Sequence, residues 1–193
     1  MGDYVNKIIN KQFLVFVSAI LIMGILSGIL YYYSLDQSIK DNVIITMNSF
    51  NVSGINNILR HVVILSIITV SSMLIIGFPL SLFYLYYEGI GIGFTLTVFT
   101  ILSGMKGLLY SIIYIIFTKA LFIFLLFISI KKILNISKLI VNYMVNKNSE
   151  KIKSNLIYNF KNLIYVILLI ILNDIIIYFF SDNVLNLFAF LIN

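Results

Sequence analysis

The chain has 193 residues, of which 61% are hydrophobic and only 10% are charged, and its formal net charge is +6. An ordinary soluble domain is about half apolar and about a quarter charged, so this composition excludes a soluble globular enzyme and a disordered chain. The absence of cysteine excludes disulfides, thiolate metal sites and a cysteine nucleophile, and a single histidine excludes a multi-histidine metal site.

Five apolar stretches approach or exceed the roughly 20 residues that a membrane-spanning helix needs. We expect spans at about 12–33, 61–87, 89–105, 107–130 and 162–181. The first is longer than the apolar core of a signal peptide, which predicts a retained anchor. Pro79, the only proline, follows Gly77 near the end of the second span and is expected to kink or end that helix. The fold class predicted for residues 1–193 is all-α, a polytopic helical bundle in one integral membrane domain.

Two segments between these spans are more polar than the spans themselves. In the segment 34–60, apolar residues recur at helical spacing, which predicts an amphipathic helix on the outer surface: Ile39, Val43, Met47 and Phe50. The segment 131–161 carries seven lysines and two apolar stripes, which predicts amphipathic helices on an anionic inner leaflet. A docking surface for another protein is the alternative for this segment. No Gly-rich phosphate loop is present, so no nucleotide binding is expected. The net positive charge of a membrane protein indicates lysine-rich cytoplasmic loops, so no nucleic-acid binding is expected either.

The distribution of lysines predicts how the chain is oriented. In a five-span chain, the N-terminal segment and the segment 131–161 fall on one side of the membrane and together hold nine lysines. The other side holds Lys40, Arg60 and Lys106. Cytoplasmic loops carry an excess of Lys and Arg, so we expect the N-terminus inside and the C-terminus outside in a multi-pass protein of the cell membrane.

Lys119 and Asp174 lie inside the fourth and fifth spans, where a charge costs about 2.5–3.5 kcal/mol. At about 1.5 Å per residue, each lies roughly 18–20 Å from the cytoplasmic lysines. We therefore expect a buried ion pair between two adjacent antiparallel helices. The pair either fixes which helix faces which or serves a proton or ion relay.

The residues point to no catalytic, cofactor or metal site. His61 is expected at the membrane interface at the start of a helix. It does not form a triad with Ser66, because the two lie five residues apart and no acid is adjacent in sequence.

Glycines four residues apart allow membrane helices to approach closely. Gly24 and Gly28 have this spacing in the first span, and Gly89 and Gly93 have it in the third. The spacing predicts either tight packing within the bundle or self-association into a homo-oligomer.

Several short motifs follow one another between residues 56 and 136. They are Asn56-Asn57, Gly77-Phe78-Pro79, Glu88-Gly89-Ile90-Gly91-Ile92-Gly93-Phe94 and the turn-like Gly104-Met105-Lys106-Gly107-Leu108-Leu109. In this order they resemble the stage II sporulation protein M family. The N-terminal anchor and the lysine-rich segment fit as well, so the likeness covers most of the chain. Where that family usually carries a proline in the fourth span, this chain has Phe117-Thr118-Lys119.

The resemblance implies a non-enzymatic scaffold for engulfment, in the mother-cell membrane at the sporulation septum. Such a protein would hold two peptidoglycan-degrading partners, stage II sporulation proteins D and P, at its outer side. The contacts would be the segment 34–59 and the lipid-facing sides of the first and fifth spans. The alternative is a small transporter or the permease subunit of an ABC-type exporter. A water-filled cavity reaching Lys119 and Asp174 would favour that alternative.

Overall fold

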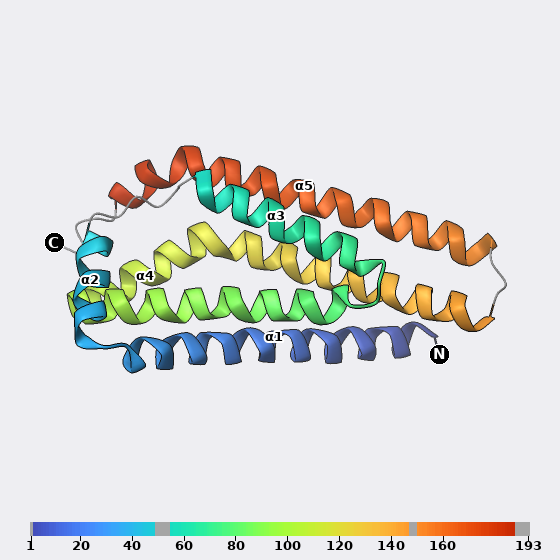
Figure 1. The fold of residues 1–193 in the computed structure, drawn as a ribbon, viewed down its shortest axis with the longest axis horizontal. Coiled ribbons are helices and arrows are strands. Elements are labelled where there is room, and N and C mark those ends of the chain that lie inside the picture. Colours follow the sequence, from blue (N-terminus) through green and yellow to red (C-terminus); the bar gives the residue numbers. More distant parts are fainter. Residues whose placement is uncertain (1, 49–54, 147–149, 188–193) are drawn as a thin grey trace.

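The computed structural model describes residues 2–48, 55–146 and 150–187, and these residues form five helices (Figure 1). The helices are α1 (Gly2–Ser34), α2 (Gln37–Asn48), α3 (Ile55–Ser72), α4 (Gly77–Asn146) and α5 (Glu150–Leu187). No strand occurs in these three ranges. The expected all-α class is therefore confirmed.

Helix α4 reverses direction in its middle and is two helices joined by a sharp bend. Ser103 and Gly104 have non-helical backbone angles, and Gly104 has a φ of 58°. This left-handed conformation suits glycine, which has no Cβ to clash. A Cβ on Gly107 would collide with the carbonyl oxygen of Phe99, so the chain returns closely past itself. We call residues 77–102 the first limb and residues 105–146 the second limb. The exposed Lys106 lies in the first turn of the second limb, beside the bend.

Five helical passes result, namely α1, α3, the two limbs of α4, and α5, and successive passes run in opposite directions (Figure 1). The N-terminal end of α1 lies at the same end of the bundle as the junction between α4 and α5. Helix α2 and the Ser103–Gly104 bend lie at the other end. Three stretches are long and apolar enough to cross a membrane: Lys11–Ser34, Gly77–Met144 and Lys153–Phe180. The apolar part of α3, Ile58–Ser72, is shorter. These helices indicate a membrane-embedded protein.

The helix boundaries between residues 61 and 105 differ from the expected spans 61–87 and 89–105. Helix α3 ends at Ser72, and α4 begins at Gly77 after a short turn. The turn residues Met73, Leu74, Ile75 and Ile76 are all apolar and exposed, so hydropathy gives no sign of a break there. Ile75 has a φ of 66°, which is rare for a β-branched residue.

Pro79 therefore does not kink or end the second span. It lies in the first turn of α4, where its missing N–H leaves no intrahelical hydrogen bond unmade. Gly77 opens the same helix, and a Cβ there would collide with the backbone of Ser72. The Gly77-Phe78-Pro79 motif thus starts a helix.

The paired glycines bring α1 against the first limb of α4. A Cβ on Gly24 or Gly28 would collide with the carbonyl oxygens of Tyr86 or Ile90, both on the first limb. A Cβ on Gly93 would collide with the carbonyl oxygen of Ile25, and one on Gly89 would lie 2.8 Å from that of Leu21. The two glycine pairs face each other within one chain, so the close approach that their spacing predicts occurs inside the bundle.

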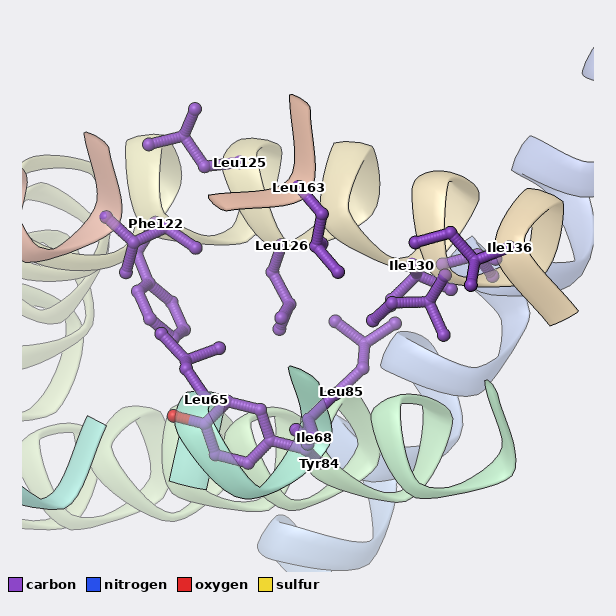
Figure 2. Packing of buried hydrophobic residues seen from close by; sticks show 13 residues of the cluster. Leu65, Ile68, Tyr84, Leu85, Phe122, Leu125, Leu126, Ile130, Ile136 and Leu163 are labelled. Atoms are coloured by element: carbon purple, nitrogen blue, oxygen red, sulfur yellow. The ribbon is translucent and has the colours of Figure 1, made fainter. Parts of the chain in front are cut away.

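The apolar core joins α1, α3, both limbs of α4 and α5 (Figure 2). Its largest fully buried side chains include Phe122, Leu65, Leu85, Leu126, Ile130 and Leu163. Ile133 and Ile136 on the second limb are also buried in this cluster, at 2% and 0% exposure. Burial of this apolar stripe holds the second limb against its neighbours.

The lysine-rich segment 131–161 thus differs from the expected surface helices. Its first part belongs to the second limb, which continues without interruption to Asn146, and its last part belongs to α5, which begins at Glu150. The end of the second limb and the start of α5 form a helical hairpin that extends past the turn between α3 and α4 (Figure 1). We call residues 131–146 and 150–161 the lysine-rich hairpin. At the opposite end, α2 occupies residues 37–48 of the expected segment 34–60; Phe50 of its predicted stripe lies outside the described residues.

Candidate functional site

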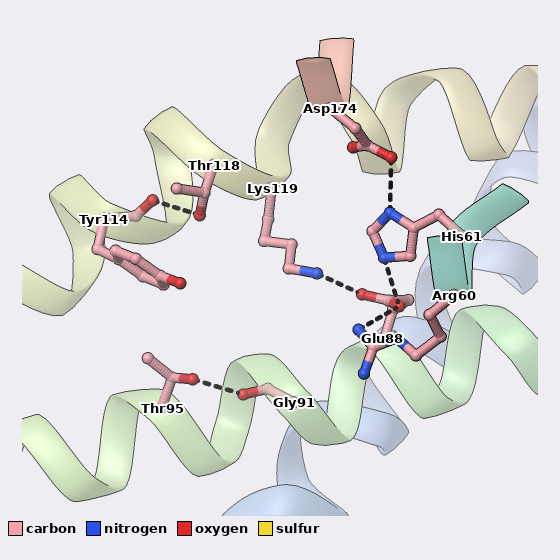
Figure 3. A network of polar contacts seen from close by, with 9 residues as sticks. All are labelled: Arg60, His61, Glu88, Gly91, Thr95, Tyr114, Thr118, Lys119 and Asp174. Carbon is pink, nitrogen blue, oxygen red and sulfur yellow. Dashed lines mark hydrogen bonds and ion pairs between the residues drawn. The ribbon is translucent and has the colours of Figure 1, made fainter. Parts of the chain in front are cut away.

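Glu88 is the centre of a charged network inside the bundle (Figure 3). It lies within the first limb of α4, and its side chain is only 3% exposed. Lys119, on the second limb, donates from Nζ to Glu88 Oε2 over 2.7 Å. Two groups of α3 face the other oxygen, Oε1: Arg60 Nη2 at 4.0 Å and His61 Nε2 at 3.6 Å. One carboxylate thus contacts three basic residues.

His61 connects this carboxylate to a second one on α5. Its Nδ1 lies 2.8 Å from Asp174 Oδ2, and both side chains are buried. Because an ionised carboxylate only accepts hydrogen bonds, the short contact places a proton on His61 Nδ1. The imidazole ring stacks on Phe122, with ring centroids 4.6 Å apart. We call Arg60, His61, Glu88, Lys119 and Asp174 the charged network.

The network is balanced in charge. Arg60 and Lys119 supply two permanent cations, and Glu88 and Asp174 supply two carboxylates. With His61 neutral, these charges cancel. A second proton, taken up on Nε2, would face Glu88 Oε1 at 3.6 Å. The geometry can therefore hold the passes in register, and it offers one place where an additional proton meets a carboxylate.

Lys119 and Asp174 do not form the expected ion pair with each other. Lys119 bonds to Glu88, and Asp174 bonds to His61. The two residues belong to one network, but they are joined only through His61 and Glu88. The physical reason is that Glu88, expected between two spans, lies inside a helix and presents a carboxylate directly to Lys119.

His61 also differs from its expected position at the membrane interface. It is 5% exposed and lies between two acids that are distant in sequence. Ser66, considered with it, is on the exposed face of α3 and donates to the carbonyl of Val62 over 2.7 Å. Arg60, His61 and Glu88 were not predicted from the sequence as network members. A detectable signal was the equal spacing of Glu88 and Lys119 from the Gly104 turn.

A cavity of about 850 Å³ opens beside the network, and we call it the polar chamber. Its wall includes Arg60, Glu88 and Lys119, with residues of α1 and both limbs of α4. Tyr86 donates to Ser27 across the α1 side of the chamber, over 2.7 Å. Asp174 is not among the lining residues. A cavity that reaches both Lys119 and Asp174 would favour a transporter, and this one reaches only Lys119.

Within the described residues, no group of three or more His, Asp or Glu side chains is placed to hold a metal ion. Comparisons of the chain with protein-family models, with curated proteins and with solved structures find no match. A function is therefore inferred from the geometry of this chain and from the resemblance of its motifs.

Proposed function

We propose that this chain is a non-enzymatic membrane scaffold that positions partner proteins in the cell membrane. The observation that carries the proposal is the charged network, which ties four of the five helical passes to one another. The glycine contacts tie α1 to the first limb of α4 in the same way. The ion pairs and the close glycine contacts together favour a rigid bundle. Its outer faces then keep a fixed arrangement, which a scaffold needs in order to position its partners.

The proposed topology has five membrane passes, with the N-terminus in the cytoplasm and the C-terminus outside. Two features support it. The N-terminal end of α1 and the lysine-rich hairpin lie at the same end of the bundle (Figure 1), so their lysines would share one side. An excess of lysine marks the cytoplasmic side. Helix α2 would then lie outside.

The partners follow from the resemblance to stage II sporulation protein M. They would be stage II sporulation proteins D and P, held at the sporulation septum in the mother-cell membrane. Their membrane segments would pack on exposed apolar faces of α1 and α5. Met23 and Leu30 on α1, and Phe179 on α5, are between 61% and 69% exposed. Apolar faces of this kind are available to pack against a partner's helices in lipid.

Photo-crosslinking in sporulating cells tests this function. A photoreactive residue in place of Met23 or Phe179 is expected to capture the two peptidoglycan-degrading partners. The same residue in place of the buried Val17 is the matched control and should capture neither. Recovery of only a nucleotide-binding subunit with the tagged chain would contradict the scaffold.

A permease subunit is the second candidate, and the polar chamber favours it. The chamber brings Arg60, Glu88 and Lys119 to a cavity large enough for a small solute. Because the chain has no cysteine, a single Gly91→Cys variant reports directly on this space. Rapid reaction with a charged, water-soluble thiol reagent in intact vesicles, together with recovery of an ATPase subunit, would support the permease over the scaffold.

A further inference from the structure

The wall of the polar chamber carries more positive charge than negative. Two cations, Arg60 and Lys119, share the single carboxylate of Glu88. The other two members of the network, His61 and Asp174, bond to each other and are not among the lining residues. The chamber wall therefore has an excess of one positive charge.

Arg60 and Lys119 also have hydrogen-bond donors that Glu88 does not use. An ammonium has three donors, and Lys119 uses one on Glu88. Arg60 has five donors, and its contact with Glu88 is 4.0 Å, longer than a hydrogen bond. The side chains of Arg60 and Lys119 are 42% and 24% exposed, whereas that of Glu88 is 3% exposed. The groups most open to a ligand are thus the cations, and the carboxylate in the same wall is almost covered.

The remaining wall is largely apolar and aromatic. Phe94, Ile90 and Ile115 line it, together with the open face of Gly91. A Cβ placed on Gly91 would meet no atom within 4 Å, so the backbone there borders open space. The volume of about 850 Å³ is near the upper end of small-molecule sites, which run from about 300 to 1,000 Å³. A free inorganic anion would leave most of this apolar wall uncovered.

We propose that the polar chamber binds an anionic amphiphile, with a phosphate headgroup between Arg60 and Lys119 and an apolar chain along Phe94 and Ile115. A guanidinium binds phosphate through two parallel hydrogen bonds, and the excess positive charge matches the single charge of a phosphodiester. This assignment goes beyond the scaffold and holds whether the chain recruits partners or moves a solute.

Native mass spectrometry of the full chain in detergent tests the site at equilibrium, without partners or a gradient. The probes are phosphatidylglycerol, phosphatidylcholine and inorganic phosphate. We expect one phosphatidylglycerol per chain, bound at least about tenfold more tightly than phosphatidylcholine, because the choline cation cancels the phosphate charge and would face Arg60 and Lys119. Equal binding of the two lipids, or displacement of the lipid by equimolar inorganic phosphate, would overturn the assignment.

Two variants locate the binding in the chamber. Arg60→Gln removes a headgroup donor and should weaken phosphatidylglycerol binding about tenfold. Gly91→Leu fills the open space without meeting an atom at its Cβ and should abolish binding. The controls are Lys131→Gln on the lysine-rich hairpin and Ser66→Leu on the exposed face of α3, and both should bind as the unmodified chain does. Undiminished binding by a folded Gly91→Leu chain would place the lipid elsewhere and overturn the proposal.

Discussion

Glu88 and Lys119 lie equally far in sequence from the Ser103–Gly104 bend, and their head groups meet at 2.7 Å. Both limbs of α4 are α-helices with the same rise per residue, so a sharp reversal brings equidistant residues to the same depth. The ion pair therefore fixes the register of one limb against the other. His61 and Asp174 extend the same layer of charge to α3 and α5.

Removing one member of the Glu88–Lys119 pair should destabilise the bundle strongly. Lys119→Met leaves Glu88, only 3% exposed, without its hydrogen-bonded cation. Breaking a buried pair in this way costs about 3–5 kcal/mol. The measurement is the free energy of unfolding in mixed micelles.

The double variant Glu88→Gln with Lys119→Met is the control for that experiment, because it removes both charges together. It should recover most of the lost stability, since a neutral replacement of a buried pair costs little. A Lys119→Met chain as stable as the unmodified chain would show that the pair does not hold the two limbs.

Double-mutant cycles should identify Glu88, and not Asp174, as the partner of Lys119. Residues in direct contact show coupling energies of about 0.5–3 kcal/mol, whereas separated residues add nearly independently. We expect coupling of this size for Lys119 with Glu88 and for His61 with Asp174, and a smaller value for Lys119 with Asp174. A larger coupling between Lys119 and Asp174 would contradict the arrangement in Figure 3.

The helical class could be predicted from the sequence, but the boundary between α3 and α4 could not, and the misplaced boundary concealed the network. The turn at Met73–Ile76 is as apolar as the helices that flank it, so hydropathy merges α3 with the start of α4. The merged span put Glu88 at a boundary and His61 at an interface. Gly77 and Pro79 carried the correct signal, because proline favours the first turn of a helix.

The depth of Lys119 and Asp174 along the bundle was easier to predict from the sequence than the partners of these two residues. Lys119 and Asp174 were expected at similar depth from helical rise alone, and both do enter one connected network. Their partners depended on which helices are neighbours, and periodicity within one helix carries no information on that. The continuation of the second limb beyond Ile130 as a helix packed in the bundle was also not predicted. An amphipathic helix has the same apolar stripe whether it packs against lipid or against another helix.

Glycines of the first limb should differ sharply in their tolerance of a large side chain. In Gly93→Leu the new Cβ would collide with the carbonyl of Ile25, which forces α1 away from α4. Such overpacking costs about 1–3 kcal/mol or more. Gly91→Leu, two residues away, meets open space and should gain up to about 1 kcal/mol from helix propensity. Thermal unfolding of both variants in the same detergent measures the contrast, and equal losses would disprove the α1–α4 contact.

Labelling of single cysteines tests the proposed topology, because the chain has none of its own. Ser38→Cys lies on α2 and Lys138→Cys lies on the lysine-rich hairpin, and both positions are exposed. These segments occupy opposite ends of the bundle (Figure 1), so a membrane-impermeant thiol reagent added to intact protoplasts should label only one of them. The lysine excess predicts that Ser38→Cys reacts at once and that Lys138→Cys reacts only after lysis. The reverse order would invert the chain in the membrane, and it would place the lysine-rich hairpin outside and α2 in the cytoplasm.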